Sequence, residues 1–251
     1  VLRFSILHSQ LLRMRLDDQP AYVLHARPWR ETSLLVEMFT REHGRVGLVA
    51  RGARRPRAGI RALLLPFSPL EVGWFGKSDI RTLSDIDWQG GLPQLAGTPL
   101  VTGFYVNELI MKLVARDDPH EGLFDDYRTL IAHLARGSVA IAPALRRFEL
   151  QLLAATGYAP TLDRDLAGEP VRADAVYGFV PGEGARPGAE RGCEVSGQTL
   201  LALDHGALDQ TSAAVLREAR FLNRALLTHA LAGTELASRA LLNEVAALSD
   251  N

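Results

Sequence analysis

Arginine side chains gather in one short stretch of this chain, and residues of this type at this density suit the binding of a polyanion. Residues 41–61 carry seven arginines and one acidic residue, Glu42, a local formal charge of +6, whereas all 251 residues together carry −1. Arginine binds phosphate through two parallel hydrogen bonds and stacks on nucleobases. Because like charges repel, holding them together costs free energy unless an anion offsets it. We therefore predict a phosphate-binding surface made of Arg45, Arg51, Arg54, Arg55, Arg57 and Arg61.

Neighbouring residues could complete this surface. Lys77 and Arg81 follow on the next predicted turn and strand, where they either extend a binding groove or are ordinary surface charges. Trp29, Phe67 and Trp74 could each stack on a base, although such rings more often belong to a core. Trp29 is the best stacking candidate of the three. The arginine stretch itself could be a solvated loop, but the nearly uniform sign of its charges favours phosphate binding.

A second constellation is the arginine pair Arg146 and Arg147, inside a predicted helix that begins near Pro143. We expect both arginines to face outward, because Leu145 and Phe148 lie on the apolar face of this helix. The pair is then either two solvated charges or an anchor for an acidic peptide tail or a terminal carboxylate. In the second case apolar neighbours such as Phe148 would take a side chain of the tail.

Motifs for catalysis are absent from the sequence. It has no GxxxxGK[ST] phosphate loop, no GxGxxG before a helix and no GxSxG. The seven histidines show no metal-ligand spacing, and Cys193 is the only cysteine, so neither a disulfide within the chain nor a cysteine-based zinc site is expected. No run approaches the roughly 20 apolar residues that cross a bilayer. We expect a cytoplasmic protein that is not an enzyme, has no cofactor and does not contact a membrane.

The arginine surface must be positioned by a β-rich front half. Apolar or alternating runs at residues 21–27, 33–40, 45–51, 69–75 and 80–84 are separated by turn residues. About five short strands in some seventy residues are typical of a small barrel or sandwich. We favour a five-stranded OB-type barrel, because that fold commonly presents a basic face to single-stranded nucleic acid.

The rear half has the period of helices. The predicted fold class is α+β, with an OB-fold barrel at residues 19–90 and an all-helical C-terminal domain at 91–251, whose last helix covers about 234–248. We expect an irregular insert at about 160–197 and an N-terminal extension at 1–18, in which Met14 is a candidate start. Residues 1–88 carry a net charge of +5 and residues 89–251 one of −6, which predicts two parts with different partners.

Five segments resemble one family. VLHARPWRETSLLVEMFTREHGRVGLVARGARR (residues 23–55) is similar to the N-terminal domain of the bacterial recombination and repair mediators of the RecO family. Four further segments also resemble this family: LLPFSPLEVGWFGKSDIRTL (64–83), YVNELIMKL (105–113), PALRRFELQLLAATGY (143–158) and SRALLNE (238–244). The similarity runs in order over about residues 20–160 and, more weakly, over 197–245.

The resemblance implies a function and a set of partners. It implies binding of single- and double-stranded DNA, annealing of complementary strands without ATP, and a place in the cytoplasm at the nucleoid. It also implies partnership with RecR and with the acidic C-terminal tail of single-stranded DNA-binding protein (SSB), which together load RecA onto coated strands. The alternative is an OB-fold adaptor that binds RNA or an acidic protein partner; a nuclease is a more distant alternative, because the sequence shows no metal site.

The resemblance also implies roles for single residues. Arg45, Arg51, Arg54, Arg55 and Arg57 fall on the DNA-binding face, and Arg146, Arg147 and Phe148 fall on the helix that receives the tail. Some relatives carry a CxxC…CxxC zinc module in the segment that matches residues 160–195. This chain has only Cys193 there, so we expect no zinc.

Overall fold

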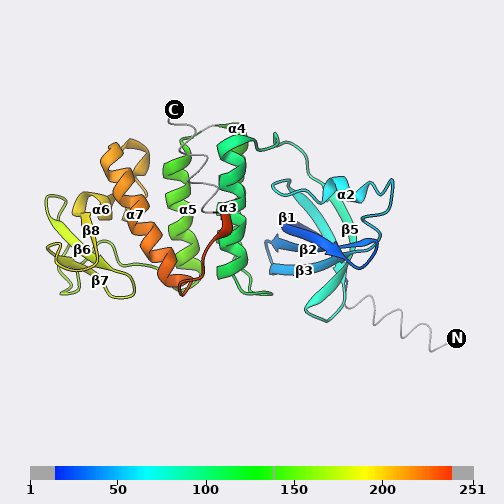
Figure 1. Ribbon diagram of the computed structural model, residues 1–251, viewed down its shortest axis with the longest axis horizontal. Coiled ribbons are helices and arrows are strands. Elements are labelled where there is room, and N and C mark those ends of the chain that lie inside the picture. The colour runs from blue at the N-terminus through cyan, green and yellow to red at the C-terminus, as the bar shows by residue number, and fades with distance from the viewer. Residues whose placement is uncertain (1–14, 138, 239–251) are drawn as a thin grey trace. The chain divides into compact units, whose positions relative to one another are not determined.

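The computed structural model describes residues 15–137 and 139–238 (Figure 1). These residues form two compact units, one reaching to Arg136 and one beginning at Gly137. Within these ranges no helix is both long and apolar enough to span a membrane. The expectations for residues 1–14, including a start at Met14, and for a helix beyond residue 238 lie outside the described residues.

The first unit is built on a closed five-stranded barrel with the strand order β1-β2-β3-β5-β4. Its strands are β1 (Arg15–Trp29), β2 (Ser33–Thr40), β3 (Gly44–Ala50), β4 (Leu70–Phe75) and β5 (Ile80–Trp88). Neighbouring strands are antiparallel except β3 and β5, which close the barrel as a parallel pair. A short helix, α2 (Ile60–Leu63), lies between β3 and β4. The OB-like barrel, followed by helices, confirms the predicted α+β class.

Strand β1 begins earlier than the sequence predicts. Arg15 pairs with Phe75 and Leu16 with Trp74, and an irregularity between Leu16 and Gln19 then resets the register. The predicted extension over residues 1–18 is therefore wrong for residues 15–18. Aspartates are rare in strands, so Asp17 and Asp18 did not indicate that β1 includes this segment.

The barrel core is filled by alternate residues of its strands, among them Val36, Met38, Leu48 and Val72. Trp74 is 1% exposed and belongs to this core. Phe67 is also buried, with its ring edge-to-face on Phe104 at 5.1 Å. These two rings are therefore core residues and are not available to stack on bases. Alternation sends the other side chains of each strand to the outer surface of the barrel.

Two helices of the first unit, α3 (Gly97–Leu113) and α4 (Glu121–Arg136), are tied to β1. Asn107 of α3 donates from Nδ2 to the carbonyl oxygens of Val23, at 3.4 Å, and Leu24, at 3.0 Å, where β1 shifts register. Tyr127 of α4 donates its hydroxyl to Asn107 Oδ1 at 2.7 Å. Burial raises the pKa of Tyr127 well above its ordinary value. This buried polar network fixes both helices on the barrel.

The loop between α3 and α4 also contacts the barrel. The backbone nitrogen of Asp117 donates to the carbonyl oxygen of Arg45 at 3.0 Å. Gly44 has φ +62°, and a Cβ at this position would collide with the carbonyl oxygen of Asp118. Only glycine allows so close an approach of the two backbones. Residues of this loop are thereby brought to the edge of β3.

The second unit combines helices with a small antiparallel sheet of strand order β7-β6-β8 (Figure 1). Its elements are α5 (Ile141–Ala155), β6 (Val176–Val180), β7 (Gly184–Pro187), β8 (Cys193–Ser196), α6 (Gly197–Asp204), η1 (Leu208–Gln210) and α7 (Ala213–Ala230). The sheet lies within residues 160–197, so the prediction of an irregular insert in an all-helical region is corrected here. Strands of four or five residues, separated by turns with several glycines, are too short to show a period in the sequence.

Glu218 of α7 stabilises the junction of β8 and α6. Its Oε2 accepts hydrogen bonds from the backbone nitrogen of Ser196 at 2.9 Å, from Ser196 Oγ at 2.6 Å and from Thr199 Oγ1 at 2.6 Å. Burial opposes the charged form of this carboxylate, but the hydrogen bonds outweigh burial and lower the pKa of Glu218. A lowered pKa means that the folded state holds the charged form more tightly than the unfolded state does.

Glu218 should therefore contribute stability above its unfolded pKa, which is about 4.3, and that stability should be lost as the pH falls through the lower folded value. We expect Glu218→Gln to reduce the free energy of unfolding by about 1 kcal/mol at neutral pH and by less at pH 3. Urea unfolding of both proteins between pH 3 and 7 measures this convergence. Stability curves that stay parallel over this range would show that Glu218 gains nothing from its charge.

Candidate nucleic-acid interface

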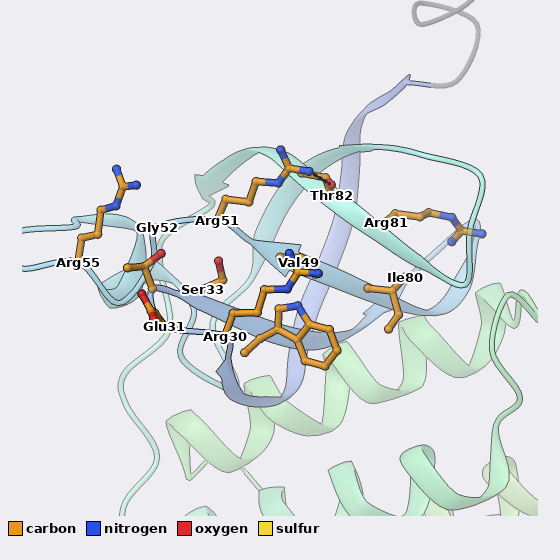
Figure 2. A pocket seen from close by; sticks show the side chains of 12 residues that line it. Arg30, Glu31, Ser33, Val49, Arg51, Gly52, Arg55, Ile80, Arg81 and Thr82 are labelled. Carbon is orange, nitrogen blue, oxygen red and sulfur yellow. Dashed lines mark hydrogen bonds between the residues drawn. The ribbon is translucent and has the colours of Figure 1, made fainter.

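A hollow of about 740 Å³ lies on the outer surface of the barrel, where the β1–β2 turn, the end of β3 and the start of β5 meet (Figure 2). Arg30, Arg51, Arg55 and Arg81 line it, with Glu31 as the single acidic residue. Trp29, Ser33 and Thr82 supply further parts of the lining. A cationic hollow with hydroxyl groups and an indole ring has the chemistry for a phosphate chain that carries aromatic bases.

Strand pairing explains why these side chains converge. Val46, Leu48 and Ala50 point into the barrel, so Val49 and Arg51 lie on its outer surface. The parallel register of β3 and β5 pairs Val49 with Thr82, and Arg51 Nη2 donates to Thr82 Oγ1 at 3.4 Å (Figure 2).

The β1–β2 turn reaches the same hollow from the other side. Trp29 and Ser33 are the last pair of this hairpin, and Arg30 in the turn has φ +52°, a left-handed conformation. Arg54 joins the turn to the arginine loop: its backbone nitrogen donates to the carbonyl oxygen of Thr32 at 2.8 Å. Its Nη1 donates to the carbonyl oxygens of Arg30, at 3.2 Å, and Glu31, at 3.3 Å. Arg54 therefore holds the β1–β2 turn and the arginine loop together next to the hollow.

The main cations of the hollow form no ion pair with Glu31, the single carboxylate in its lining. Arg30, Arg51 and Arg55 are exposed, and none of them forms an ion pair with any residue in the ranges that the structure describes. Trp29, which lines the same hollow, is only partly buried, so part of its ring can be reached from solvent. Three unpaired guanidinium groups beside an accessible indole favour an anionic ligand over a neutral one.

Arg81 connects this hollow to a second one. Its Nη1 lies 2.6 Å from Asp117 Oδ1, and its side chain is 19% exposed. The second hollow, of about 400 Å³, is lined by Arg81 together with Arg15, His43 and Lys77. Lys77 therefore lies near Arg81, as predicted, but outside the first hollow.

Arg45 does not join the others. Its side chain is 16% exposed and faces Glu37 of β2, with Nη1 3.8 Å from Oε2. Arg116, from the loop between α3 and α4, also forms an ion pair with Glu37. Burial lowers the pKa of Arg45 below its ordinary value. Arg45 lies at the opposite end of β3 from Arg51 and is used within the fold, so we leave it out of the candidate interface.

Arg57 and Arg61 are exposed residues beyond the lining of the hollow, Arg57 at φ +67° in the loop and Arg61 on α2. Arg30 lines the hollow but was not among the site residues predicted from the sequence. The sequence does place Arg30 next to Trp29, between two predicted strands. Only the pairing of distant strands shows that this turn lies beside the arginine loop. In the described ranges, no group of three or more His, Cys, Asp or Glu side chains could hold a metal ion. The absence of zinc stays a prediction.

The predicted tail-binding residues separate in the structure. Phe148 is 1% exposed and belongs to the core of the second unit. Arg146 is 12% exposed, with Nη2 3.0 Å from Oε1 of the buried Glu149, so the expectation that it faces outward is wrong. The prediction assumed one apolar face on α5. A helix that is buried on more than one side has no single such face, so the direction of Arg146 does not follow from the positions of the apolar residues.

Arg147 alone lies at an opening. Its Nη2 is 2.7 Å from Asp209 Oδ2 and donates to the carbonyl oxygen of Gly206 at 3.1 Å. It lines a hollow of about 390 Å³ whose other walls include Leu150 and Leu203. A cation at the rim of an apolar hollow can hold a carboxylate while the hollow takes a side chain.

Comparison with known proteins gives one consistent family. The family model described as Recombination protein O N terminal matches residues 14–91, and the one described as Recombination protein O C terminal matches residues 97–240. The DNA repair protein RecO of Laribacter hongkongensis is 95% identical over 237 residues, which cover 94% of this chain and 98% of the relative. The DNA repair protein RecO of Chromobacterium violaceum is 48% identical over 243 residues, with 94% and 98% covered. The protein of that name from Thiobacillus denitrificans is 44% identical over 244 residues, with 94% of each covered.

Proposed function

This chain belongs to the recombination protein O (RecO) family of DNA repair proteins, and we propose that it binds single- and double-stranded DNA and anneals complementary strands without ATP. The observation that carries the proposal is the hollow beside β3 and β5, which Arg30, Arg51 and Arg55 line together with Trp29 and where none of the three forms an ion pair with a described residue. The hollow fits a DNA backbone whose phosphates replace the missing carboxylates, with a base on the indole.

Annealing follows from charge neutralisation. Two DNA strands repel each other through their phosphates, and arginines that neutralise part of this charge lower the barrier to pairing. The free energy of base pairing then drives the reaction, so neither nucleotide hydrolysis nor a catalytic group is needed, and we infer that the protein is not an enzyme. In the cell, at the nucleoid, it would act with RecR to help load RecA onto single strands coated with SSB.

We further propose that the acidic C-terminal tail of SSB binds at the hollow beside Arg147. Arg147 is 37% exposed at its side chain, and its partner Asp209 is 53% exposed, so this ion pair can open to water and to a competing carboxylate. The apolar wall that includes Leu150 and Leu203 can take a side chain of the tail. Arg146 and Phe148 support this surface from within and make no contact with the tail.

Arg147→Ala should weaken the binding of a fluorescent peptide with the sequence of the SSB tail by about tenfold, because one charge-assisted hydrogen bond is lost. Fluorescence anisotropy measures the dissociation constant. Arg164→Ala is the matched control, since Arg164 is an exposed arginine of the same unit paired with Asp163. Equal affinities of the two variants would place the tail elsewhere.

The proposed function is tested by annealing of complementary oligonucleotides, naked or coated with the cognate SSB, without ATP. We expect the wild type to anneal both kinds of strand and Arg147→Ala to anneal only naked strands efficiently. A wild type that fails to anneal even naked strands, yet binds RNA or an acidic protein, would replace the mediator function with that of an adaptor.

A further inference from the structure

Helix α7 presents a row of arginines around an exposed aromatic ring. Arg217, Phe221 and Arg224 are separated by three, four or seven residues and share one side of the helix, and Arg220, next to Phe221, lies beside them. All four are exposed, and Phe221 is 63% exposed. The opposite side of α7 is buried through residues such as Leu222. The row is thus a surface feature with a solvent-facing ring at its centre.

The charges of this row differ from the other arginines of the same unit. Residues 139–238 contain nine arginines and twelve acidic residues. Six of the nine form ion pairs with carboxylates: Arg146, Arg147, Arg164, Arg172, Arg186 and Arg191. Arg217 and Arg224 form no such ion pair in the part of the chain that the structure describes, although the charge of Arg217 helps to lower the pKa of the neighbouring Glu218. In a unit with an excess of acidic residues, unpaired cations on one helix face favour an anionic partner.

The shape of the face selects between two kinds of anion. An acidic peptide with an apolar anchor needs a hollow for that anchor. Two hollows of this unit, one beside Arg147 and one beside Tyr158, are lined without Phe221, Arg217 or Arg224. A nucleobase needs only an accessible flat ring with a cation near its phosphate. A single exposed phenylalanine is common on protein surfaces, but this one lies between Arg217 and Arg224 along the helix.

We propose that this face of α7 is a second binding surface for single-stranded nucleic acid, with phosphates at Arg217 and Arg224 and a base stacked on Phe221. The two arginines are seven residues apart, about 10 Å along the helix axis, which is within reach of one short run of a strand. The inference rests on the proposed function, because a protein that anneals strands gains from separate contacts for two strands. The hollow of the barrel supplies one contact and α7 the other.

Photocrosslinking of the full chain to an oligonucleotide that contains 5-iododeoxyuridine tests this surface directly, since the crosslinked peptides are mapped by mass spectrometry. We expect crosslinks at Trp29 and at Phe221. Arg217→Glu with Arg224→Glu should reduce the Phe221 crosslink at least about tenfold through lost phosphate contacts and leave the Trp29 crosslink in place. Arg164→Glu with Arg172→Glu is the control, because these exposed, ion-paired residues of the same unit give the same change in charge.

Each other outcome overturns a defined statement. Crosslinks at Trp29 without any at Phe221 would overturn the second surface and leave the proposed function standing. The absence of crosslinks at both positions would overturn the two together. If Phe221 does not crosslink but the α7 variant loses binding of purified SSB while the control keeps it, then α7 binds an acidic protein and the inference is wrong.

Discussion

Reversal of two arginines, Arg51→Glu with Arg55→Glu, will lower the affinity for single-stranded DNA by at least about 100-fold at 0.1 M salt. Both side chains line the hollow of the barrel, and neither forms an ion pair with a described residue. The substitution removes two phosphate contacts and places two negative charges where phosphates would lie. It should also flatten the dependence of log K on log salt by about 1.4, because each phosphate contact to a single strand contributes about 0.7.

Titration of a labelled oligonucleotide at several salt concentrations measures both quantities. The matched control is Arg128→Glu with Arg136→Glu, a pair of exposed arginines on α4 of the same unit that do not line the hollow. The fold of the Arg51→Glu, Arg55→Glu variant should be unaffected, since its one side-chain hydrogen bond at stake is the 3.4 Å contact from Arg51 to Thr82. The control loses only the exposed ion pair of Arg128 with Asp125, which contributes little to stability. Similar affinities and salt slopes for the two double variants would show that DNA binds at another surface.

The local part of this interface could be predicted from the sequence. Alternation in β3 and the loop that follows it put Arg51 and Arg55 on a basic surface without knowledge of any partner strand. Arg30 could not be predicted, because its place depends on the contact between Thr32 and Arg54, which connects segments on either side of two strands. The place of Arg45 could not be predicted for a related reason: strand register brings it to Glu37, and Arg116 comes from a loop some seventy residues later in the chain.

The second unit shows the same limit. Its two long helices, α5 and α7, carry enough residues for a helical period to appear, whereas the eight-residue α6 was not predicted. The sheet of β6, β7 and β8 was missed, since each strand is too short for a period and is defined by its neighbours. Among the arginines of α5, the sequence did contain one unused signal. Arg146 and Glu149 stand three residues apart in a mostly apolar helix, a spacing typical of an ion pair.

This ion pair leads to the second large effect. Arg146→Ala should lower the free energy of unfolding by about 3 kcal/mol, whereas the adjacent Arg147→Ala should cost less than about 1 kcal/mol. Glu149 is fully buried, and Arg146 Nη2 lies 3.0 Å from its Oε1. Asn223 of α7 donates from Nδ2 to Glu149 Oε2 and to the carbonyl oxygen of Arg146, each at 2.9 Å. Removing the guanidinium leaves a buried carboxylate without its opposite charge.

Urea unfolding of the two single variants measures the difference, and a double variant separates its causes. Arg146→Met with Glu149→Met replaces the buried pair by apolar side chains of similar length, so it should recover most of the stability that Arg146→Ala loses. Equal and small losses for both single variants would mean that the pair is open to water. The expected loss of stability also determines which variant is suitable for testing tail binding. Because Arg146→Ala weakens the fold around Glu149, its loss of SSB binding would not locate the tail, whereas Arg147→Ala changes the rim of the hollow and leaves the ion pair beneath it intact.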